Sequence, residues 1–362
     1  MSRNARSTCT SAGCAELSTS TTRPTSSGPC GAAATRSIST RLKLLVIAGS
    51  VLLATAWTAP PPLIPEDNPP SAASVELGRW LFYDKRLSVN GTYACASCHR
   101  LDRAFTDGRP VAIGATGKSH WRNTPSLANV VYRPVLAWAE PRLRRLEKQL
   151  LIPLLGTRPV EMGASEQVVL AVLREDELYR SLFADAFGGE VSLANAAKAI
   201  AAFERTLISF ESTWDRGAHS ESARRGEALF FSERANCFRC HPAPHFTDTY
   251  RTADLPFDEI AFHNIGLSAS DRTRYRSPSL RNVAVTAPYM HDGSIATLAE
   301  VIDHYAAGGR GAGARNPHKS TYVTGFSISE AEKKDLIAFL ESLTDESFLS
   351  DPRFADPFAE IR

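Results

Sequence analysis

A five-residue pattern, Cys-x-x-Cys-His, occurs twice in this chain, at 95–99 and at 237–241. In this pattern two thiols can add across the two vinyl groups of one haem, and the adjacent histidine can bind the iron. A four-cysteine zinc site or a pair of redox disulfides would also use four cysteines, but neither needs a histidine directly after each pair. The pattern therefore predicts two covalently bound haem c groups. The residues that would hold them are Cys95, Cys98, His99, Cys237, Cys240 and His241.

Each motif follows a similar short segment. LGRWLFY at 77–83 precedes the first, and RGEALFF at 225–231 precedes the second. Both have the form Gly-x-x-Leu-Phe-aromatic, which predicts a short amphipathic helix before each haem site. Further helices are predicted over 194–207 and over 329–343, the latter opening with a capping box from Ser329 to Glu332. No alternating strand pattern of useful length is present.

These features predict a mainly α fold with two cytochrome c-type domains, each with a covalent haem c, whose haems face a shared interface. We expect the N-terminal cytochrome c domain at 59–212 and the C-terminal one at 213–346, followed by a tail at 347–362. The boundary is expected in the polar stretch at 209–222.

The start of the chain has a different character. Residues 1–40 are rich in Ser, Thr, Ala and Gly, which predicts a disordered extension within 1–58. Arg41 and Lys43 precede an apolar run at 44–57, which is typical of a secretory signal and predicts a periplasmic protein. The alternative is an uncleaved membrane anchor, although the run is short for a span. The formal net charge of +2 argues against nucleic acid as the main partner.

The sequence resembles the bacterial di-haem cytochrome c peroxidases and their MauG-type relatives over about residues 77–343. The blocks that carry the resemblance are LFYDKRLS at 81–88, RNTP at 122–125, PVEMG at 159–163, FHNIG at 262–266 and PSLRNVAVTAPYMHDG at 278–293. PLLG at 153–156 and HYAAGG at 304–309 are most similar to the MbnH-type MauG-like enzymes.

The resemblance implies that the first haem reacts with peroxide. Conventional members block this haem with a loop histidine, eight residues before the asparagine of the RNTP block. That position is Ala115 here, which cannot bind iron, so we expect an open, five-coordinate first haem. His120 is nearby and is expected to be a solvated loop histidine.

The second haem needs a sixth ligand. Conventional members use a methionine fourteen residues after the His-Asp-Gly histidine, and Tyr305 occupies that position here. Tyr305 ends a helical stripe that also contains Leu298, Val301 and Ile302. The stripe predicts that Tyr305 is buried, with His304 about 100° away on the face with Glu300. Tyrosinate, a hard anionic donor, would favour the higher oxidation states of iron. A core aromatic without a ligand role is the alternative.

The resemblance also implies the remaining site residues. Glu161 matches the distal acid–base glutamate, Gln149 matches a pocket residue, and Trp138 falls near an inter-haem tryptophan that relays electrons or simply packs. The family also holds one Ca²⁺ between its haems. The matching oxygen donors are the side chain of Asn123 and the backbone carbonyls of Thr286 and Pro288.

These observations favour an enzyme of the peroxidase class. We expect hydrogen peroxide to generate a bis-Fe(IV)-like state, shared by the two haems, that oxidises a partner protein. The MbnH-type resemblance implies a copper-binding periplasmic protein whose tryptophan is oxidised. The alternative is a conventional peroxidase that takes electrons from a small cytochrome or cupredoxin. A non-catalytic electron carrier would need two six-coordinate irons and a methionine ligand, against which Ala115 and Tyr305 argue. A structural or sensory haem protein is a weaker fourth possibility.

Overall fold

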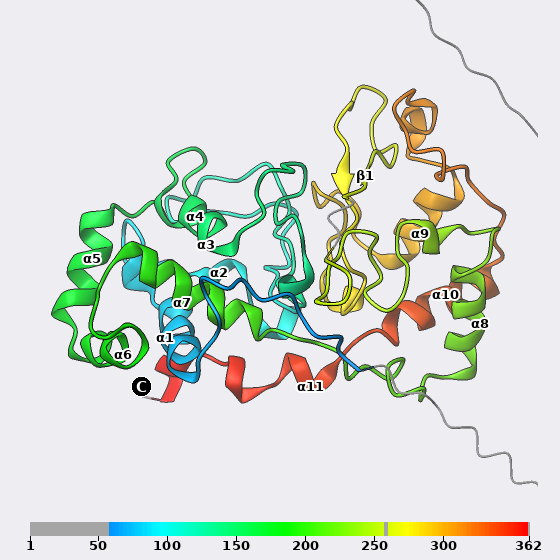
Figure 1. Ribbon diagram of the computed structural model, residues 1–362. Helices are drawn as coiled ribbons and strands as arrows, with labels where there is room; N and C mark the ends of the chain where they lie inside the picture. Colours follow the sequence, from blue (N-terminus) through cyan, green and yellow to red (C-terminus); the bar gives the residue numbers. More distant parts are fainter. Residues whose placement is uncertain (1–57, 257–259, 361–362) are drawn as a thin grey trace, which may run out of the picture. The chain divides into compact units, whose positions relative to one another are not determined.

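The protein is described here from a computed structural model of residues 58–256 and 260–360 (Figure 1). The expected disordered extension and signal segment, up to residue 57, lie outside the described residues. Within the described ranges, no helix has the length and apolar character needed to cross a membrane.

The described chain is mainly α-helical, as the sequence predicts. The α-helices are α1 (Ala72–Tyr83), α2 (Cys95–Cys98), α3 (Leu146–Gln149), α4 (Leu151–Leu155), α5 (Glu166–Glu175), α6 (Glu177–Phe187), α7 (Leu193–Arg205), α8 (Glu221–Phe230), α9 (Leu298–Ala306), α10 (Glu330–Glu341) and α11 (Glu346–Leu349). The 3-10 helices are η1 (Lys85–Leu87), η2 (Leu101–Arg103), η3 (Val130–Tyr132), η4 (Cys237–Arg239), η5 (Val283–Val285), η6 (Gly311–Arg315), η7 (Pro352–Phe354) and η8 (Pro357–Glu360). Two short strands, β1 (Phe262–His263) and β2 (Tyr275–Arg276), pair antiparallel with Phe262 opposite Arg276.

The helices expected from periodicity are present. The segments predicted at 194–207 and 329–343 correspond to α7 and α10, whose ends lie within two residues of the prediction. The capping box is confirmed. The Ser329 hydroxyl accepts the N–H of Glu332 at 3.3 Å, and the Glu332 carboxylate accepts the N–H of Ser329 at 2.9 Å.

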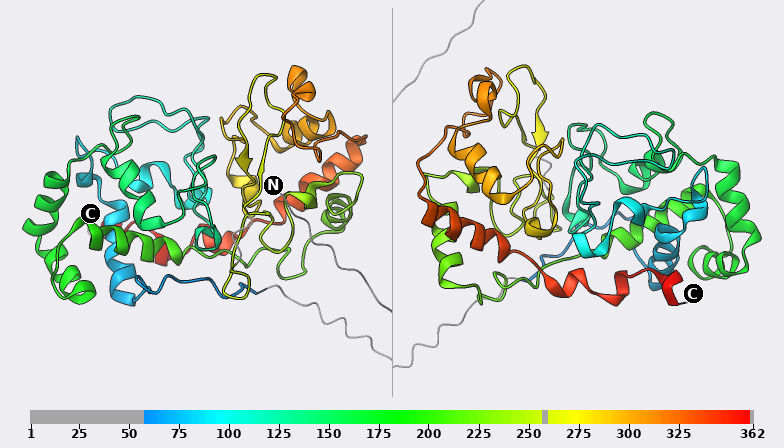
Figure 2. Two further views of the ribbon diagram at one scale, coloured as in Figure 1. Left: turned by 45° about the horizontal axis from the view of Figure 1, so that its top comes forward. Right: turned by 180° about the vertical axis from the view of Figure 1, so that it is seen from behind.

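The two segments that precede the haem motifs form equivalent helix pairs. Helix α1 packs against α7, and α8 packs against α10 (Figures 1 and 2). A Cβ on Gly78 would lie 2.0 Å from the carbonyl oxygen of Ala199, and one on Gly226 would lie 1.9 Å from that of Asp335. The shared glycine therefore lets each pair approach more closely than any other residue could.

The repeat continues beyond each haem motif. PSLANV at 125–130 and PSLRNV at 278–283 each place an asparagine in the left-handed region, with φ of 58° at Asn129 and 60° at Asn282. Each asparagine is followed by a 3-10 helix, η3 or η5. The amide of Asn129 donates to the carbonyl of Ser209, and that of Asn282 donates to the hydroxyl of Ser209, both at 2.9 Å. The equivalent asparagines of the two repeats therefore bond to the same residue, Ser209.

Two main apolar clusters form the core. The first includes Phe82 on α1 and Phe203 on α7, and the second includes Phe230 on α8 and Phe339 on α10. Phe348, from the expected C-terminal tail, is buried in the first cluster, so this segment returns to pack beside α1 and α7 (Figure 1). The domain limits expected from the sequence stay a prediction.

Candidate functional site

The first attachment motif places two thiols and an imidazole within about one helical turn. Cys95 and Cys98 are the ends of α2, and His99 follows directly. The Nδ1 atom of His99 lies 2.8 Å from the carbonyl oxygen of Phe105. Because a carbonyl can only accept, Nδ1 carries the proton and Nε2 keeps its lone pair. His99 is therefore held in the tautomer that an iron ligand needs.

The second motif repeats this arrangement. Cys237 begins η4 and Cys240 follows its last residue, and the Nδ1 atom of His241 lies 2.9 Å from the carbonyl oxygen of Phe246. Phe246 and its counterpart Phe105 both have positive φ, and each opens a Phe-Thr-Asp triplet. Burial lowers the pKa of the imidazole of His241, as it does for His99, so both are neutral and fit iron ligation.

The other uses of four cysteines fit less well. All four described cysteines are free thiols, the form in which cysteines add to the vinyl groups of a haem. In the described part of the chain, the one cluster with metal-ligand spacing combines Cys240 with Asp248 and His263, and includes no second cysteine. His263 is instead paired with Asp248, its Nε2 lying 2.6 Å from a carboxylate oxygen. The arrangement fits haem attachment and not a four-cysteine zinc site.

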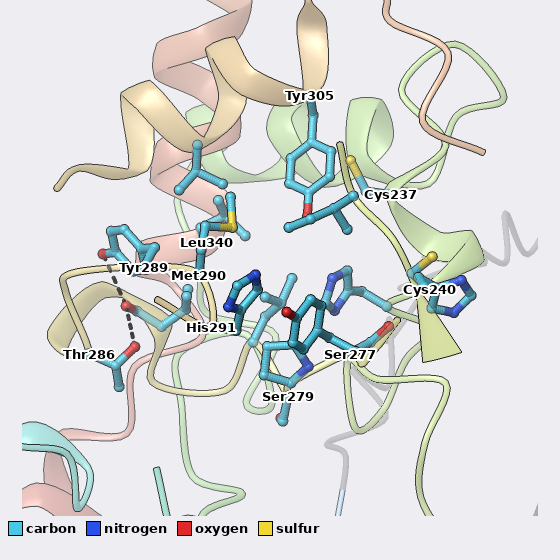
Figure 3. A pocket seen from close by; sticks show the side chains of 18 of the residues that line it. Cys237, Cys240, Ser277, Ser279, Thr286, Tyr289, Met290, His291, Tyr305 and Leu340 are labelled. Carbon is cyan, nitrogen blue, oxygen red and sulfur yellow. Dashed lines mark hydrogen bonds between the residues drawn. The ribbon is translucent and has the colours of Figure 1, made fainter. Parts of the chain in front are cut away.

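One cavity contains the second attachment motif and Tyr305. Cys237, Cys240 and His241 line it, and so does the whole predicted stripe of α9, namely Leu298, Val301, Ile302 and Tyr305. Figure 3 shows the phenol oxygen of Tyr305 pointing into this cavity, whose lining also includes Cys237 and Cys240. No described residue forms a hydrogen bond with that oxygen, and burial raises the pKa of the phenol. The geometry fits a sixth ligand, although the ligand role itself stays a prediction.

His304 shares a face of α9 with Glu300, as expected, but it is buried. His304 is 5% exposed, whereas Glu300 is open to solvent. Its Nε2 atom lies 2.9 Å from the carbonyl oxygen of Ile265. The FHNIG segment covers this side of the helix, so a face that the helical pattern alone assigns to the polar side is buried.

Ala115, the residue expected to leave the first haem open, is held through its backbone by two hydrogen bonds. Ala115 donates its N–H to the carbonyl of Glu161 at 2.7 Å, and its own carbonyl accepts from the amide of Asn90 at 2.8 Å. The loop that carries Ala115 is therefore tied to the loop that carries Glu161.

The side chain of Glu161 lies next to His120. The Nε2 atom of His120 is 3.7 Å from Glu161 Oε1, and the two side chains are 20% and 33% exposed, respectively. Burial raises the pKa of the Glu161 carboxyl. The expectation that His120 is a solvated loop histidine is wrong, because the hairpin at 112–122 folds its imidazole against Glu161.

Trp138 lies where the two repeats meet. Its indole N–H donates to the carbonyl of Asn123 at 2.9 Å, and the Arg276 guanidinium lies 5.2 Å from its ring centre. Trp138 also lines the cavity that holds Tyr305. Gln149 ends α3 and is half-buried, but no hydrogen bond joins its side chain to Glu161 in the described residues.

The three expected calcium ligands line the same cavity. The Asn123 amide nitrogen donates to the carbonyl of Arg109 at 2.9 Å, which directs the opposite oxygen away from that contact. That oxygen and the carbonyls of Thr286 and Pro288 accept no hydrogen bond from the described residues. Free oxygen donors of this kind suit a hard cation.

This cavity also contains two buried arginines that the sequence does not identify as site residues. Arg133 and Arg276 are 9% and 3% exposed and form no ion pair with a described carboxylate. Burial lowers the pKa of Arg276 to about 10 and also lowers that of Arg133. Because a buried cation without an anion is costly, the cavity fits an anionic group such as a haem propionate.

Comparison with known proteins agrees with this geometry. The sequence model of the family described as di-haem cytochrome c peroxidase matches residues 72–224. The chain is 35% identical over 333 residues to the methylamine utilization protein MauG of Methylophilus methylotrophus, covering 83% of this chain and 94% of that protein. It is 32% identical to the cytochrome-c peroxidase IdrP1 of Denitromonas iodatirespirans, covering 83% of this chain and 90% of that protein.

A solved structure extends the comparison to the fold. It is described as a MauG-like protein associated with microbial copper homeostasis, and it is 43% identical to this chain. The match covers 84% of this chain and all of that chain, with a TM-score of 0.80. The resemblance seen in the sequence, including that to MauG-like proteins, is confirmed.

Proposed function

The chain belongs to the family of di-haem cytochrome c peroxidases and MauG proteins, and on that premise we propose that it uses hydrogen peroxide to oxidise a partner protein. As a member of this family it is an oxidoreductase with two c-type haems. When bound, the haem pair supplies the redox chemistry, because it accepts two oxidising equivalents from peroxide and passes them on. The protein's own residues must hold the haems, move protons and direct the oxidising power.

The haem ligands are assigned residue by residue. Cys95 and Cys98 would hold the first haem, with His99 on its iron. Cys237, Cys240 and His241 would do the same for the second. Arg133 and Arg276 would neutralise propionates, which accounts for two buried cations that have no carboxylate partner among the described residues.

Glu161 is the proposed acid–base group at the first haem. Peroxide cleavage needs a base that takes a proton from the inner oxygen and returns it to the outer oxygen, which leaves as water. A carboxyl whose pKa is raised by burial is better matched to both halves of that task than an exposed one. Gln149 would contribute a polar contact in the same pocket.

Tyr305 is the residue that favours protein oxidation over simple peroxide removal as the proposed function. The observation behind this choice is its phenol oxygen, which points into the cavity of the second haem and has no hydrogen-bond partner among the described residues (Figure 3). Bound iron would displace the phenol proton, as metal ions do at coordinating thiols. The resulting anionic ligand would favour an oxidised second haem over one that accepts electrons from a small cytochrome.

Two further groups would couple the haem sites. Trp138 would relay charge, because it touches the Asn123 backbone on one side and Arg276 on the other. A calcium ion held by Asn123, Thr286 and Pro288 would fix the RNTP block against the segment before the His-Asp-Gly motif.

The proposed partner is a copper-binding periplasmic protein. The support is the similar structure, described as associated with copper homeostasis, together with the signal-like segment at 41–57. In the test, diferric protein, peroxide and the candidate partner are mixed, and the partner is analysed by mass spectrometry. Addition of oxygen to a tryptophan supports the proposal. An unmodified partner, with rapid peroxide-dependent oxidation of a reduced small cytochrome, would establish the conventional peroxidase instead.

A further inference from the structure

His120 is placed against the proposed acid–base group by a short hairpin. Its N–H donates to the carbonyl of Ala112 at 2.7 Å, which closes the hairpin at 112–122. Its ring lies against that of Trp121, with ring centres 4.7 Å apart and the planes tilted by 33°. Its Nε2 atom faces Glu161 Oε1 at 3.7 Å. Both the backbone and the ring of His120 are therefore held in place on the Glu161 side of the hairpin.

The hydrogen bonds of His120 fix its tautomer. The backbone N–H of Arg122 lies 3.0 Å from Nδ1 and can only donate, so Nδ1 must present its lone pair. Burial, with the nearby Arg122 charge, lowers the pKa of the imidazole and keeps it neutral. The single ring proton is then on Nε2, which points at Glu161. In this state His120 is a hydrogen-bond donor and not an iron ligand.

Among the described residues, Glu161 has no other side-chain partner of this kind. No described residue forms a hydrogen bond with its carboxylate, whereas the backbone around it is held by several hydrogen bonds, among them the one from Ala115. The other ionisable groups near the pair are the thiols of Cys95 and Cys98, which haem attachment removes, and the cation of Arg122. A lone carboxylate in such surroundings is free to rotate.

We propose that His120 is a positioning residue. Its Nε2–H group donates a hydrogen bond to the Glu161 carboxylate and holds that carboxylate in the orientation for proton transfer. A small rotation of Glu161 shortens the 3.7 Å separation to a hydrogen bond, as pairs of this kind do when substrate binds. His120 keeps its proton throughout, so Glu161 alone gives and receives the proton of peroxide. This inference rests on the proposed role of Glu161.

The donor has a predictable effect on pH dependence. Glu161 must be ionised to act as the base, so the rate with peroxide rises with pH through its pKa. A donor to the carboxylate favours the ionised form and lowers that pKa. Removing the donor should therefore move the rising limb of the pH profile upward by about one unit, the usual strength of a hydrogen bond to a charged group.

The test compares His120→Phe, which keeps a flat ring on Trp121, with His120→Gln, which keeps an N–H near the Nε2 position. We expect His120→Phe to lower the rate with peroxide about 10-fold near neutral pH and to shift the limb upward, and His120→Gln to restore both. Cyanide binding to the resting diferric protein, titrated optically over the same pH range, gives a readout apart from turnover. Its pH dependence should shift in the same direction, because hydrogen cyanide must also give up a proton to the pocket.

The exposed His318, substituted as His318→Phe, is the matched control and should match the wild type in both measurements. The inference is overturned if His120→Phe leaves both pH profiles in place, or if His120→Gln is as impaired as His120→Phe. Failure of the underlying proposal has a different signature, because Glu161→Gln would then react with peroxide at the wild-type rate.

Discussion

The backbone N–H of Ala115 donates a 2.7 Å hydrogen bond to the carbonyl oxygen of Glu161. Conventional relatives place a blocking histidine at the Ala115 position, on a mobile loop. Here the residue ends in a methyl group, and Asn90 holds its carbonyl from the other side at 2.8 Å. A loop fastened at both ends of one residue has little freedom to cover the first haem.

We therefore predict that the resting diferric protein has one high-spin and one low-spin haem without prior reduction. Low-temperature EPR of the purified protein tests this directly. Two low-spin signals in the resting state would mean that another side chain closes the first haem. His120 would then be the first to examine, because its ring lies beside Glu161.

Glu161→Gln should slow the reaction with peroxide by about 10²–10⁴-fold, the usual cost of losing a general acid–base group. Stopped-flow absorbance at saturating and limiting peroxide measures the rate, and the resting spectra of both haems should be nearly unchanged. Glu175→Gln, on the exposed end of α5, is the matched control and should react normally. Equal rates for the two variants would move the acid–base role to another residue.

Gly226→Ala should destabilise the protein by about 1–3 kcal/mol, because its Cβ would lie 1.9 Å from the carbonyl oxygen of Asp335 and would push α8 from α10. Denaturant unfolding of the haem-loaded protein, followed by circular dichroism, measures the change. Ala228→Ser, on the exposed side of the same helix, should change stability by no more than about 0.5 kcal/mol. Equal stability of the two variants would contradict the close packing described here.

Calcium should bind with a stoichiometry of one ion per chain and should be removed by a chelator. The proposed protein ligands are neutral oxygens of Asn123, Thr286 and Pro288, and a site with few charged ligands binds calcium less tightly than a carboxylate-rich one. Metal analysis after dialysis against dilute calcium tests the stoichiometry. Asn123→Ala should lose the ion, whereas Asn195→Ala, at another buried asparagine bonded to a carbonyl, should keep it. Calcium retained by both variants would refute the site.

Much of the arrangement follows from patterns that are local in the sequence. The spacing of Cys95, Cys98 and His99 predicts the haem motif, and the stripe that ends in Tyr305 predicts which side of α9 faces the cavity. Such predictions succeed because helical periodicity and a contiguous motif need no knowledge of distant segments.

The features that local patterns do not predict concern residues whose surroundings come from elsewhere in the chain. His304 is buried by the FHNIG segment, about 40 residues earlier, and His120 lies against Glu161, which is about 40 residues later. The sequence does not predict that Arg133 and Arg276 are buried site residues, because an arginine is most often a solvated cation. Their burial is evident only once the two repeats are packed together.

The ligand role of Tyr305 is the central claim, and Tyr305→Phe tests it most directly. The substitution keeps the ring and its packing but removes the oxygen that points into the cavity (Figure 3). Tyr289→Phe is the matched control, because Tyr289 lines the same cavity but its hydroxyl donates to the carbonyl of Val283 at 3.2 Å.

The measurement is EPR of the two resting variants beside the wild type, followed by peroxide-dependent oxidation of the partner protein. The account predicts that Tyr305→Phe loses the low-spin signal of the second haem and no longer oxidises the partner, while its first haem still reacts with peroxide. Tyr289→Phe should keep both the signal and the activity. A Tyr305→Phe protein that retains the wild-type low-spin signal and modifies its partner at the wild-type rate would contradict the account.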